Sequence, residues 1–574
     1  MRARKTRSAW IEIILGSILL IATFLRLWQL GSVQPGLAND EAGIIYSAYS
    51  IWKTGREPAG KFLPTSIQLD NSFSPVYIYI TAPFVGLLGL SPWAGRLPFA
   101  LTGIMSVLLL YFIVKKLSDN DIVALGAAGI LALIPWHIYV SRAAFDANFA
   151  LVFFLAGIYA FLTSQNKRVR SILWSLLWFF LAFYSYHATK LYFVLLLPTL
   201  ILIYWKSRTT IQRIVFILGT ILILCSYVIV LKTNGPNTRA DVLIWQNMDQ
   251  YSTEVNWQRE KSTLPEGLRP VFSNKVTVAV RKATETYLEA FSTNYLFLYG
   301  ETGALTSVYG GIINQGQLFI FMLPFLIFGV VGLSKTSTRT KLLVTLLFLF
   351  APVPSAAASD RTLIFRSFML LIPLPILAGY GINECIMWLN TQRSITKWIV
   401  VAGYSIFIII TLCSYIAHLW YRYPVYGAER WFKSSTDLSI YVRDHHTDYS
   451  RVIIVQSGSM FLFQFGIYAK IDPIIIQRAW NARPRSVIDN IVFAESPSCP
   501  RITLPTRETA SLTNLLLVWP DNCANSLLST LPQVYTIRER GEPLRSIWRM
   551  YSLPANTTFQ TNYPMDFFSL PTNQ

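Results

Sequence analysis

Charged residues are scarce in this sequence. Of its 574 residues only 14% are charged, whereas 53% are hydrophobic. In soluble domains about a quarter of the residues are usually charged, so the composition argues against a soluble globular protein. The charges that are present lie mostly between apolar stretches and in the last third of the chain. This distribution predicts a polytopic membrane protein with soluble appendages.

Acidic residues are outnumbered by basic ones, which gives a formal net charge of +19. Nucleic-acid binding would be one explanation, but the basic residues recur in short clusters beside the apolar stretches. Such clusters are typical of cytoplasmic loops, where Lys and Arg set the orientation of a membrane protein. The sequence therefore predicts no nucleic-acid partner and a cytoplasmic N-terminus. The clusters are Arg2–Arg7, Lys115–Lys116, Lys167–Arg170, Lys206–Arg213, Lys335–Lys341 and Arg393–Lys397.

Cofactor motifs are missing as well. The chain has no HExxH, no CxxC, no phosphate-binding loop and no glycine-rich dinucleotide turn. No cofactor is therefore predicted with certainty. Acidic residues could still bind a divalent metal ion even though they do not show the spacing of a known metal-binding motif, and the sequence leaves this open.

Cysteines number only five. Cys225, Cys385 and Cys413 lie in apolar stretches, which indicates core packing. Cys499 and Cys523 lie in the polar C-terminal segment. If that segment is outside the cell, the two thiols could form one disulfide; two free surface thiols is the alternative.

Eleven apolar stretches approach the ~20 residues that a membrane-spanning helix needs. The first is too long for a signal-peptide core and lacks a small-residue cleavage site, so we predict a retained anchor. Eleven crossings from a cytoplasmic start place the C-terminal segment outside. The predicted spans are 9–29, 95–114, 121–140, 148–165, 171–187, 189–205, 211–231, 316–334, 341–356, 366–387 and 397–419.

The predicted architecture is mainly α, with a transmembrane module over 1–419 and an extracytoplasmic α/β domain over 420–574. Two long outer loops cover about 30–94 and 232–315. The apolar stretch Pro75–Leu90 is only 16 residues long. If it crossed, every later basic cluster would lie outside, so we interpret it as a juxtamembrane or re-entrant segment.

Short elements are predicted in both extracytoplasmic parts. In the second outer loop, Lys275–Phe291 is expected to form an interfacial helix. In the C-terminal domain three apolar runs favour buried strands and one segment a helix, and the last ~20 residues are expected to be disordered. The strands are predicted at Arg451–Val455, Pro473–Gln477 and Leu515–Trp519, and the helix at Asp437–Arg443.

An adjacent acid pair, Asp40 and Glu41, is the main candidate for chemistry. It lies in the first outer loop, where we predict an amphipathic helix over 40–53 with Asn39 as its cap. Acids in a first helical turn can simply complement the helix dipole. Neighbouring residues of a helix point in different directions, so two roles are expected: one carboxylate removes a proton while the other orients an acceptor, a metal or a loop.

Further charged residues lie at the outer ends of the predicted spans. Asp146 is either a second acid at the site, binding acceptor or metal, or a simple helical pair with Arg142. Lys190, beside His187 in a short outer turn, is either a phosphate-binding cation or a lysine extending to the interface. Arg366 lies at the start of the tenth span, and its planar guanidinium suits phosphate.

An ordered set of segments resembles the GT-C glycosyltransferases, specifically the branch of protein O-mannosyltransferases and aminoarabinose-lipid A transferases (glycosyltransferase family 39 and relatives). The resemblance covers most of residues 10–390. It departs at Leu69–Val76, where several relatives carry a lysine before two prolines and this chain does not. The segments are Asp40-Glu41, Pro75, Gly95-Arg96-Leu97-Pro98, Ser141–Asp146 and Ala290–Gly300.

The resemblance implies a membrane enzyme that moves a sugar from a polyprenyl-phosphate carrier to an acceptor outside the cytoplasm. It implies Asp40 as general base in an inverting displacement, with Glu41 as an acceptor or structural contact. Arg366, Lys190 and His187 would then serve the donor phosphate, Arg366 before Lys190. The sugar stays open, as does the acceptor, which could be a protein, a lipid or a cell-wall glycan.

Two other classes of protein are alternatives to a glycosyltransferase. A transporter or flippase of lipid-linked glycans would place ionisable residues near the membrane midplane and show paired halves with broken helices. Here the acids and bases lie at the outer ends of spans, which favours an enzyme at an interface. A non-catalytic scaffold is the third alternative, and the intact Asp40-Glu41 pair argues against it.

Overall fold

The computed structural model describes most of the chain, and residues 1, 70–71, 165–167, 235–241, 247, 302–310, 360–361, 456–457, 496–500, 504–514, 524–532, 554–557 and 561–574 lie outside the described part. The described residues form two compact units. The helical unit comprises residues 1–28 and 99–416, and the mixed unit comprises residues 29–98 and 417–574. Each is described by itself.

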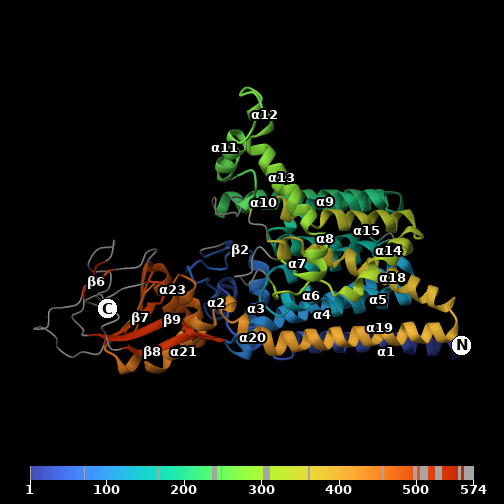
Figure 1. Ribbon diagram of the computed structural model, residues 1–574. Coiled ribbons are helices and arrows are strands. Elements are labelled where there is room, and N and C mark those ends of the chain that lie inside the picture. The colour runs from blue at the N-terminus through green and yellow to red at the C-terminus, as the bar shows by residue number, and fades with distance from the viewer. Residues whose placement is uncertain are drawn as a thin grey trace, which may run out of the picture. The chain divides into compact units, whose positions relative to one another are not determined.

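Apolar helices dominate the helical unit (Figure 1). Within it α14 packs against α18, α18 against α5, and α7 against α8. Its long helices are α1 (Arg2–Leu27), α4 (Pro92–Ser118, whose first turns belong to the mixed unit), α5 (Asp121–Leu133), α6 (Pro135–Ser141), α7 (Ala147–Thr163), α8 (Val169–Phe183), α9 (Thr189–Ile203), α10 (Thr210–Asn234), α14 (Leu323–Ser334), α15 (Thr338–Phe350), α18 (Pro373–Asn390) and α19 (Ser394–Ala417).

Each of the eleven predicted spans coincides with one of these helices, or with the bent pair α5 and α6. Within the described residues, six helices are long and apolar enough to cross a membrane, and the bent pair makes a seventh. Five more apolar helices are shorter, among them α3 (Pro75–Leu88), which forms the run that we did not assign as a span. The number of crossings stays a prediction.

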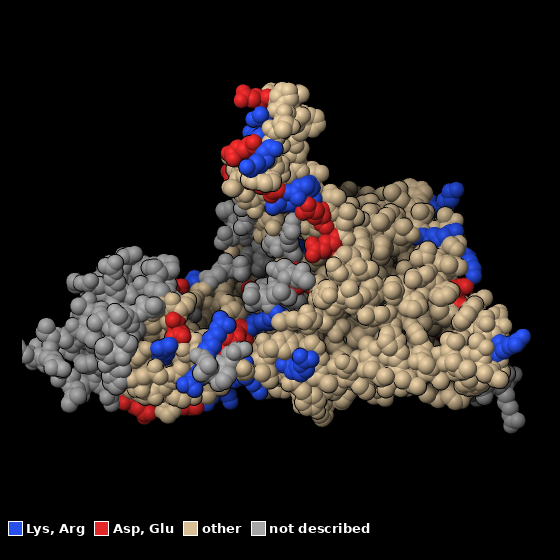
Figure 2. Space-filling view, viewed as in Figure 1, with Lys and Arg blue, Asp and Glu red and all other residues tan. Residues whose placement is uncertain are grey.

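Charge is absent from most of the flank of the helical unit (Figure 2). The charges at the end of the unit where the N-terminus lies are mostly Lys and Arg. A broad surface without charge is what a hydrocarbon environment requires, and the gathered cations agree with the clusters seen in the sequence.

The second long loop, predicted to be an outer one, belongs to the helical unit and stands out from it as an arm of helices (Figure 1). Its main helix, α13, covers most of the predicted helix, and Asn274 caps it by accepting from the amides of Val276 and Thr277. The base of the arm is fixed to α15, because Tyr287 donates to the carbonyl of Leu349 over 2.9 Å. The arm contains α11 (Ser252–Glu260), α12 (Arg269–Phe272) and α13 (Lys275–Glu289). Two short helices, α16 (Val353–Ala356) and α17 (Leu363–Arg366), follow α15 in the chain.

The mixed unit joins the first outer loop to the C-terminal segment. This grouping differs from the predicted modules, which placed the loop with the transmembrane part and the C-terminal segment by itself. Its helices are α2 (Asn39–Thr54), α3 (Pro75–Leu88), α20 (Tyr423–Tyr426), α21 (Lys433–His445), α22 (Phe461–Tyr468) and α23 (Pro473–Asn481). A short hairpin pairs β1 (Ile67–Gln68) with β2 (Ser72–Phe73).

A six-stranded mixed sheet forms the core of this unit, in the order β4-β5-β3-β7-β9-β8. The central strands β5, β3 and β7 run parallel and are almost wholly buried, as strands covered on both faces must be. The strands are β3 (Arg451–Val455), β4 (Arg485–Ile488), β5 (Ile491–Ala494), β7 (Leu515–Pro520), β8 (Gln533–Glu539) and β9 (Glu542–Leu553), while β6 (Arg501–Thr503) pairs separately with β10 (Thr558–Gln560).

Two of the three predicted strands are confirmed, Arg451–Val455 as β3 and Leu515–Trp519 within β7, and the predicted helix at 437–443 lies within α21. The prediction of a strand at Pro473–Gln477 is wrong. The segment is the helix α23, because the side chain of Asp472 accepts from the amide of Ile474 and Pro473 occupies the first helical position.

Cys225, Cys385 and Cys413 are free thiols. The expectation of core packing is wrong for Cys225 and Cys413, which are exposed on the surface of their helices, and Cys385 is half-buried. Cys523 is disulfide-bonded, and its predicted partner, Cys499, lies outside the described residues, as does the tail that was expected to be disordered.

Candidate active site

Glu41 is fully buried and forms an ion pair with Arg96 of the same unit. Nε and Nη2 of Arg96 donate to Oε1 and Oε2 of Glu41, each over 2.8 Å, and neither side chain is exposed. The other donors of the guanidinium bind backbone carbonyls of Leu30 and Gln34 through Nη1 and of Gly36 through Nη2, over 3.3, 2.9 and 2.6 Å. A guanidinium has five N–H donors, and all five find an acceptor here.

This pair explains two of the segments that carried the family resemblance. The acid pair and the Gly95–Pro98 segment, 55 positions apart at Glu41 and Arg96, bind each other. A buried charge pair persists only with close geometry and complete hydrogen bonding, and the two-pronged contact supplies both. Glu41 therefore ties the start of α2 to the start of α4.

Asp40 lies beside this pair in the first turn of α2 but in a different setting. Its side chain is half-buried, whereas Glu41 has no exposed surface. The expectation that both acids fall in the first turn is confirmed. The expectation that Asn39 caps the helix is wrong, because the helix begins at Asn39 and the extended residue before it is Ala38, which has no side-chain cap.

The C-terminal segment holds α2 in place. Gln464 of α22 donates to the carbonyl of Leu37 over 2.9 Å, just before the acid pair. Further along, the hydroxyl of Tyr46 donates to the carbonyl of Ile471 over 2.8 Å. The C-terminal segment thus positions the helix that carries Asp40.

Gly36 permits a close backbone contact in the same place. A Cβ atom at this position would lie 2.0 Å from the carbonyl oxygen of Trp431, so no other residue fits without moving the backbone. The indole ring of Trp431 in turn lies 5.5 Å from the guanidinium carbon of Arg96, in a cation–π arrangement.

Sequence reasoning missed Glu57 in the first outer loop. Its side chain is 1% exposed and accepts from the amide of Gln68 over 3.0 Å. Burial raises the pKa of the Glu57 carboxyl from 4.5 to about 7, although the Gln68 amide and the charge of Lys61 act in the opposite direction. The residue was missed because it has no acidic neighbour and stands in no recognisable motif.

Arg142 in the helical unit closes the end of α1. Its Nη1 and Nη2 donate to the carbonyls of Leu25 and Trp28, each over 2.8 Å. A helix leaves its last carbonyls without intrahelical partners, and a buried guanidinium satisfies them. Arg142 and Asp146 lie in the turn between α6 and α7 and not within one helix, so the expected helical spacing is wrong, while their pairing stays a prediction. Asp146 is half-buried.

Another buried arginine of the helical unit, Arg26, was not singled out by sequence reasoning. Arg26 of α1 donates to the carbonyls of Leu131 and Ala132 and contacts Nδ1 of His137 over 2.8 Å. These carbonyls are freed where Pro135 breaks the bent pair of helices, which turns by 59°. The signal was available, since an ionisable residue within a span is usually buried for a reason.

Lys190 and His187 are neighbours in the helical unit. The ammonium of Lys190 lies 3.5 Å from Nδ1 of His187 and 4.9 Å from the ring centre of Tyr227, with Phe183 at 5.7 Å. The aromatic faces favour a charged lysine. Lys190 is in the first turn of α9 rather than in the predicted turn.

Arg366 lies in the short helix α17, where it is half-buried and its Nε donates to Oγ1 of Thr362 over 2.9 Å. The carboxylate of Glu301, a buried residue, accepts hydrogen bonds from the first two amides of this helix, those of Leu363 and Ile364, over 3.0 and 2.8 Å. Glu301 thus positions the element that carries Arg366. It follows directly on the Ala290–Gly300 segment of the family resemblance.

The described residues contain no group of three or more His, Cys, Asp or Glu side chains that could hold a metal ion. Those described residues thus supply no donor set to assign to a divalent ion. The sequence left a divalent metal ion open as one possibility, and that possibility stays untested.

Comparison with known proteins gives three findings. The family model "Dolichyl-phosphate-mannose-protein mannosyltransferase" matches residues 72–231. A curated relative, "Putative mannosyltransferase YkcB" of Bacillus subtilis (strain 168), is 25% identical over 221 residues, which cover 38% of this chain. The match spans only 30% of that relative's length.

Solved structures show the fold. ArnT from Cupriavidus metallidurans, solved with undecaprenyl phosphate bound, superposes with a TM-score of 0.53 at 12% identity, covering 95% of this chain and 98% of ArnT. At that identity the likeness shows the fold alone. The Asp40-Glu41 pair lies outside the segment that the family model matches. The chain is thus a multi-pass membrane protein with the GT-C glycosyltransferase fold, and its residues 72–231 match the dolichyl-phosphate-mannose-protein mannosyltransferase family.

Proposed function

We propose that this protein is a membrane glycosyltransferase that moves a sugar from a polyprenyl-phosphate carrier to an acceptor outside the cytoplasm. The observation that carries the proposal is the unequal setting of the acid pair: Glu41 is engaged on both oxygens by Arg96, while Asp40 stays partly accessible in the same helical turn. The GT-C fold and the mannosyltransferase family match support the same reaction class.

In the proposed reaction Asp40 is the general base. Its carboxylate takes the proton of the acceptor hydroxyl as the acceptor oxygen forms a bond to the anomeric carbon. The bond from that carbon to the carrier phosphate breaks, and the polyprenyl phosphate leaves with the electron pair. A single displacement inverts the anomeric configuration.

The leaving phosphate needs positive charge. Arg366 is the first candidate and Lys190, beside His187, the second. Arg366 offers a planar guanidinium that can bind two phosphate oxygens at once, and Glu301 fixes the helix that bears it. Asp146 would bind the acceptor. In this proposal Arg142 supports the site by holding the end of α1 and does not touch the substrate.

The topology is part of the proposal. Eleven crossings with a cytoplasmic N-terminus leave both long loops and the C-terminal domain outside. The Lys and Arg clusters in the sequence support this orientation. A donor with a long apolar tail would then enter from the bilayer, and the acceptor from the aqueous side.

The test is a transfer assay with the purified full-length protein. The protein is incubated with labelled polyprenyl-phosphate hexoses and pentoses and with protein, lipid and glycan acceptors, with and without chelator. The expected result is sugar on one acceptor class with inverted configuration, together with free polyprenyl phosphate. Translocation of an intact lipid-linked sugar across proteoliposomes, with no transfer, would contradict the proposal and assign a flippase.

Variants of the cations sharpen the test. Arg366→Gln is expected to raise the KM for the donor and lower kcat, because it removes charge from the leaving phosphate. Arg339→Gln, which removes an exposed arginine in the first turn of α15, is the matched control. Equal kinetics in the two variants would exclude Arg366 from donor binding.

A further inference from the structure

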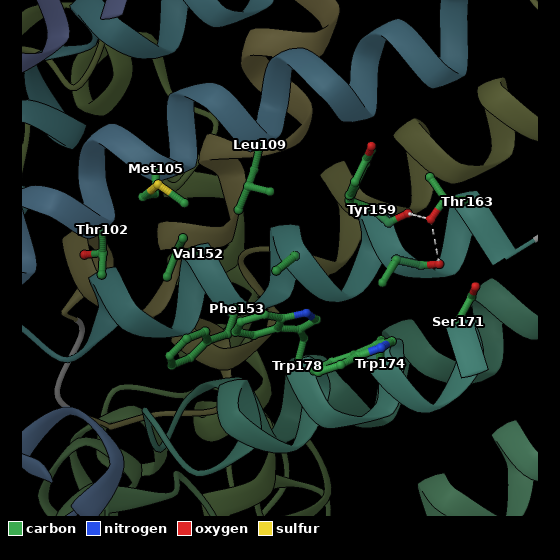
Figure 3. Close-up of a pocket in the computed structure, with 12 residues that line it drawn as sticks. Thr102, Met105, Leu109, Val152, Phe153, Tyr159, Thr163, Ser171, Trp174 and Trp178 are labelled. Carbon is green, nitrogen blue, oxygen red and sulfur yellow. Dashed lines mark hydrogen bonds between the residues drawn. The ribbon is translucent and has the colours of Figure 1, made fainter. Parts of the chain in front are cut away.

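An apolar groove of about 490 Å³ runs between three helices of the helical unit (Figure 3). None of the residues discussed above lines it. Its walls are almost entirely hydrocarbon and aromatic ring. The principal lining residues are Met105 and Leu109 from α4, Phe153 and Tyr159 from α7, and Trp174 and Trp178 from α8.

The groove is open to the surroundings of the helical unit, at a surface formed by apolar side chains. Met105 is 48% exposed and Trp174 is 46% exposed, although both line the groove. Its floor is rigid, because Trp178 stacks on Phe153 with ring centres 5.7 Å apart. A groove of this kind is shaped for a flexible hydrocarbon chain and excludes polar ligands, which would lose their hydrogen bonds there.

One end of the groove is polar. Thr163, near the end of α7, and Ser171, in the first turn of α8, line it there. Arg168 and Arg170 are exposed beside Ser171. Arg170 precedes Trp174 by four residues, so the two side chains share one face of α8. Two cations therefore stand at the end where an apolar chain would emerge.

We propose that this groove binds an anionic phospholipid, with one acyl chain between α4, α7 and α8 and its phosphate at Arg168 and Arg170. Basic residues at the ends of membrane helices attract anionic headgroups, and guanidinium groups match phosphate geometry. The cations at one end of the groove would bind the phosphate of a phospholipid, and the hydrocarbon lining along the rest would hold its acyl chain. The groove and the two arginines carry this proposal, and only the exclusion of the sugar donor as the occupant rests on the proposed function.

The sugar donor is a poorer match for this groove. The cations proposed for the donor phosphate include Lys190, which follows the C-terminal end of α8, whereas Arg168 and Arg170 stand at its N-terminal end. A donor tail in the groove would place its phosphate at the wrong end of α8. The groove therefore fits a lipid of the leaflet at which α8 begins.

Fluorescence quenching tests the proposal directly. The full-length protein is reconstituted with phosphatidylglycerol or phosphatidylcholine that carries bromine in mid-chain, and tryptophan emission is compared with that of the Trp174→Phe, Trp178→Phe double variant. The difference isolates the groove from the other tryptophans. We expect the groove-dependent emission to be quenched at about tenfold lower mole fraction of the anionic lipid.

Charge variants complete the experiment. Arg168→Gln with Arg170→Gln should make the two brominated lipids quench alike. Arg393→Gln, just before α19, with Lys397→Gln, in its first turn, should leave the preference intact. An unchanged melting temperature shows that the variants fold. Equal quenching by both lipids in the unmodified protein would overturn the proposal, as would relief of quenching by polyprenyl phosphate but not by unbrominated phosphatidylglycerol.

Discussion

The two long loops, about 30–94 and 232–315, use charge in opposite ways. In the first loop the main ion pair, Glu41 with Arg96, has no exposed surface and all five guanidinium donors are used. In the second loop the arm carries ion pairs such as Arg281 with Glu254, whose side chains are 47% and 28% exposed. Buried pairs must be complete to persist, whereas exposed pairs contribute little. The first loop is thus fixed by its charges, whereas the ion pairs on the arm of the second loop are exposed to solvent and hold it only weakly.

Replacing Glu41 should have the largest effect on stability. Glu41→Ala leaves a buried guanidinium without its anion, which costs about 3–5 kcal/mol and lowers the melting temperature by roughly 6–20 °C for a unit of this size. Thermal unfolding in detergent measures it. Arg96→Lys is the companion variant. It keeps the positive charge but cannot donate two parallel hydrogen bonds to the Glu41 carboxylate, so it should also lower the free energy of unfolding. A shift below about 1 kcal/mol in both variants would contradict the buried-pair account.

Glu57 should make the stability of the first loop depend on pH. The pKa of its carboxyl is about 7 in the folded protein and 4.5 ordinarily. The contribution of Glu57 to the free energy of unfolding is therefore fully present below pH 4.5. It falls by up to ~3 kcal/mol as the pH rises to about 7, and it stays at the lower value above that pH. Melting temperatures across this range test it. Glu57→Gln should flatten the profile and stabilise the protein above pH 7; an unchanged slope would show that another group titrates.

Glu301 gives the second loop one buried carboxylate of its own. Glu301→Ala would leave the amides of Leu363 and Ile364 unpaired and cost about 1–3 kcal/mol. Because α17 also carries Arg366, the variant should raise the donor KM as well. Glu285→Gln, on the exposed face of α13, is the control and should change neither quantity. A loss of stability with an unchanged KM would separate Glu301 from the donor site.

The smallest effect is expected in the arm. Arg281→Gln removes the exposed pair with Glu254 and should change the free energy of unfolding by less than about 1 kcal/mol, and less still at high salt. Urea unfolding at two ionic strengths measures this. A change as large as that of Glu41→Ala would erase the contrast between the two loops.

Much of the helical frame could be predicted from the sequence, because apolar length is a local property. The predicted spans coincide with helices, and β3 begins and ends where expected. The run at Pro473 was misread because three isoleucines in a row favour a strand, while the Asp-Pro pair that starts the helix was overlooked.

The candidate site was predicted only in part. Asp40 and Glu41 were found as neighbours in a first helical turn, but the partner of Glu41 lies 55 positions away and no local pattern joins the two. For the same reason the bracing of α2 by Gln464 and Ile471 could not be predicted. Such contacts depend on tertiary packing, which periodicity and motif spacing do not encode.

The central claim is that Asp40 performs chemistry while Glu41 maintains structure. The most direct measurement compares sugar transfer and melting temperature in Asp40→Asn, with Asp444→Asn, an exposed acid of the same unit, as control. We expect Asp40→Asn to lose about 10²–10⁴-fold in kcat at an unchanged melting temperature, and the control to be fully active. Near-normal transfer by a well-folded Asp40→Asn protein would contradict the account.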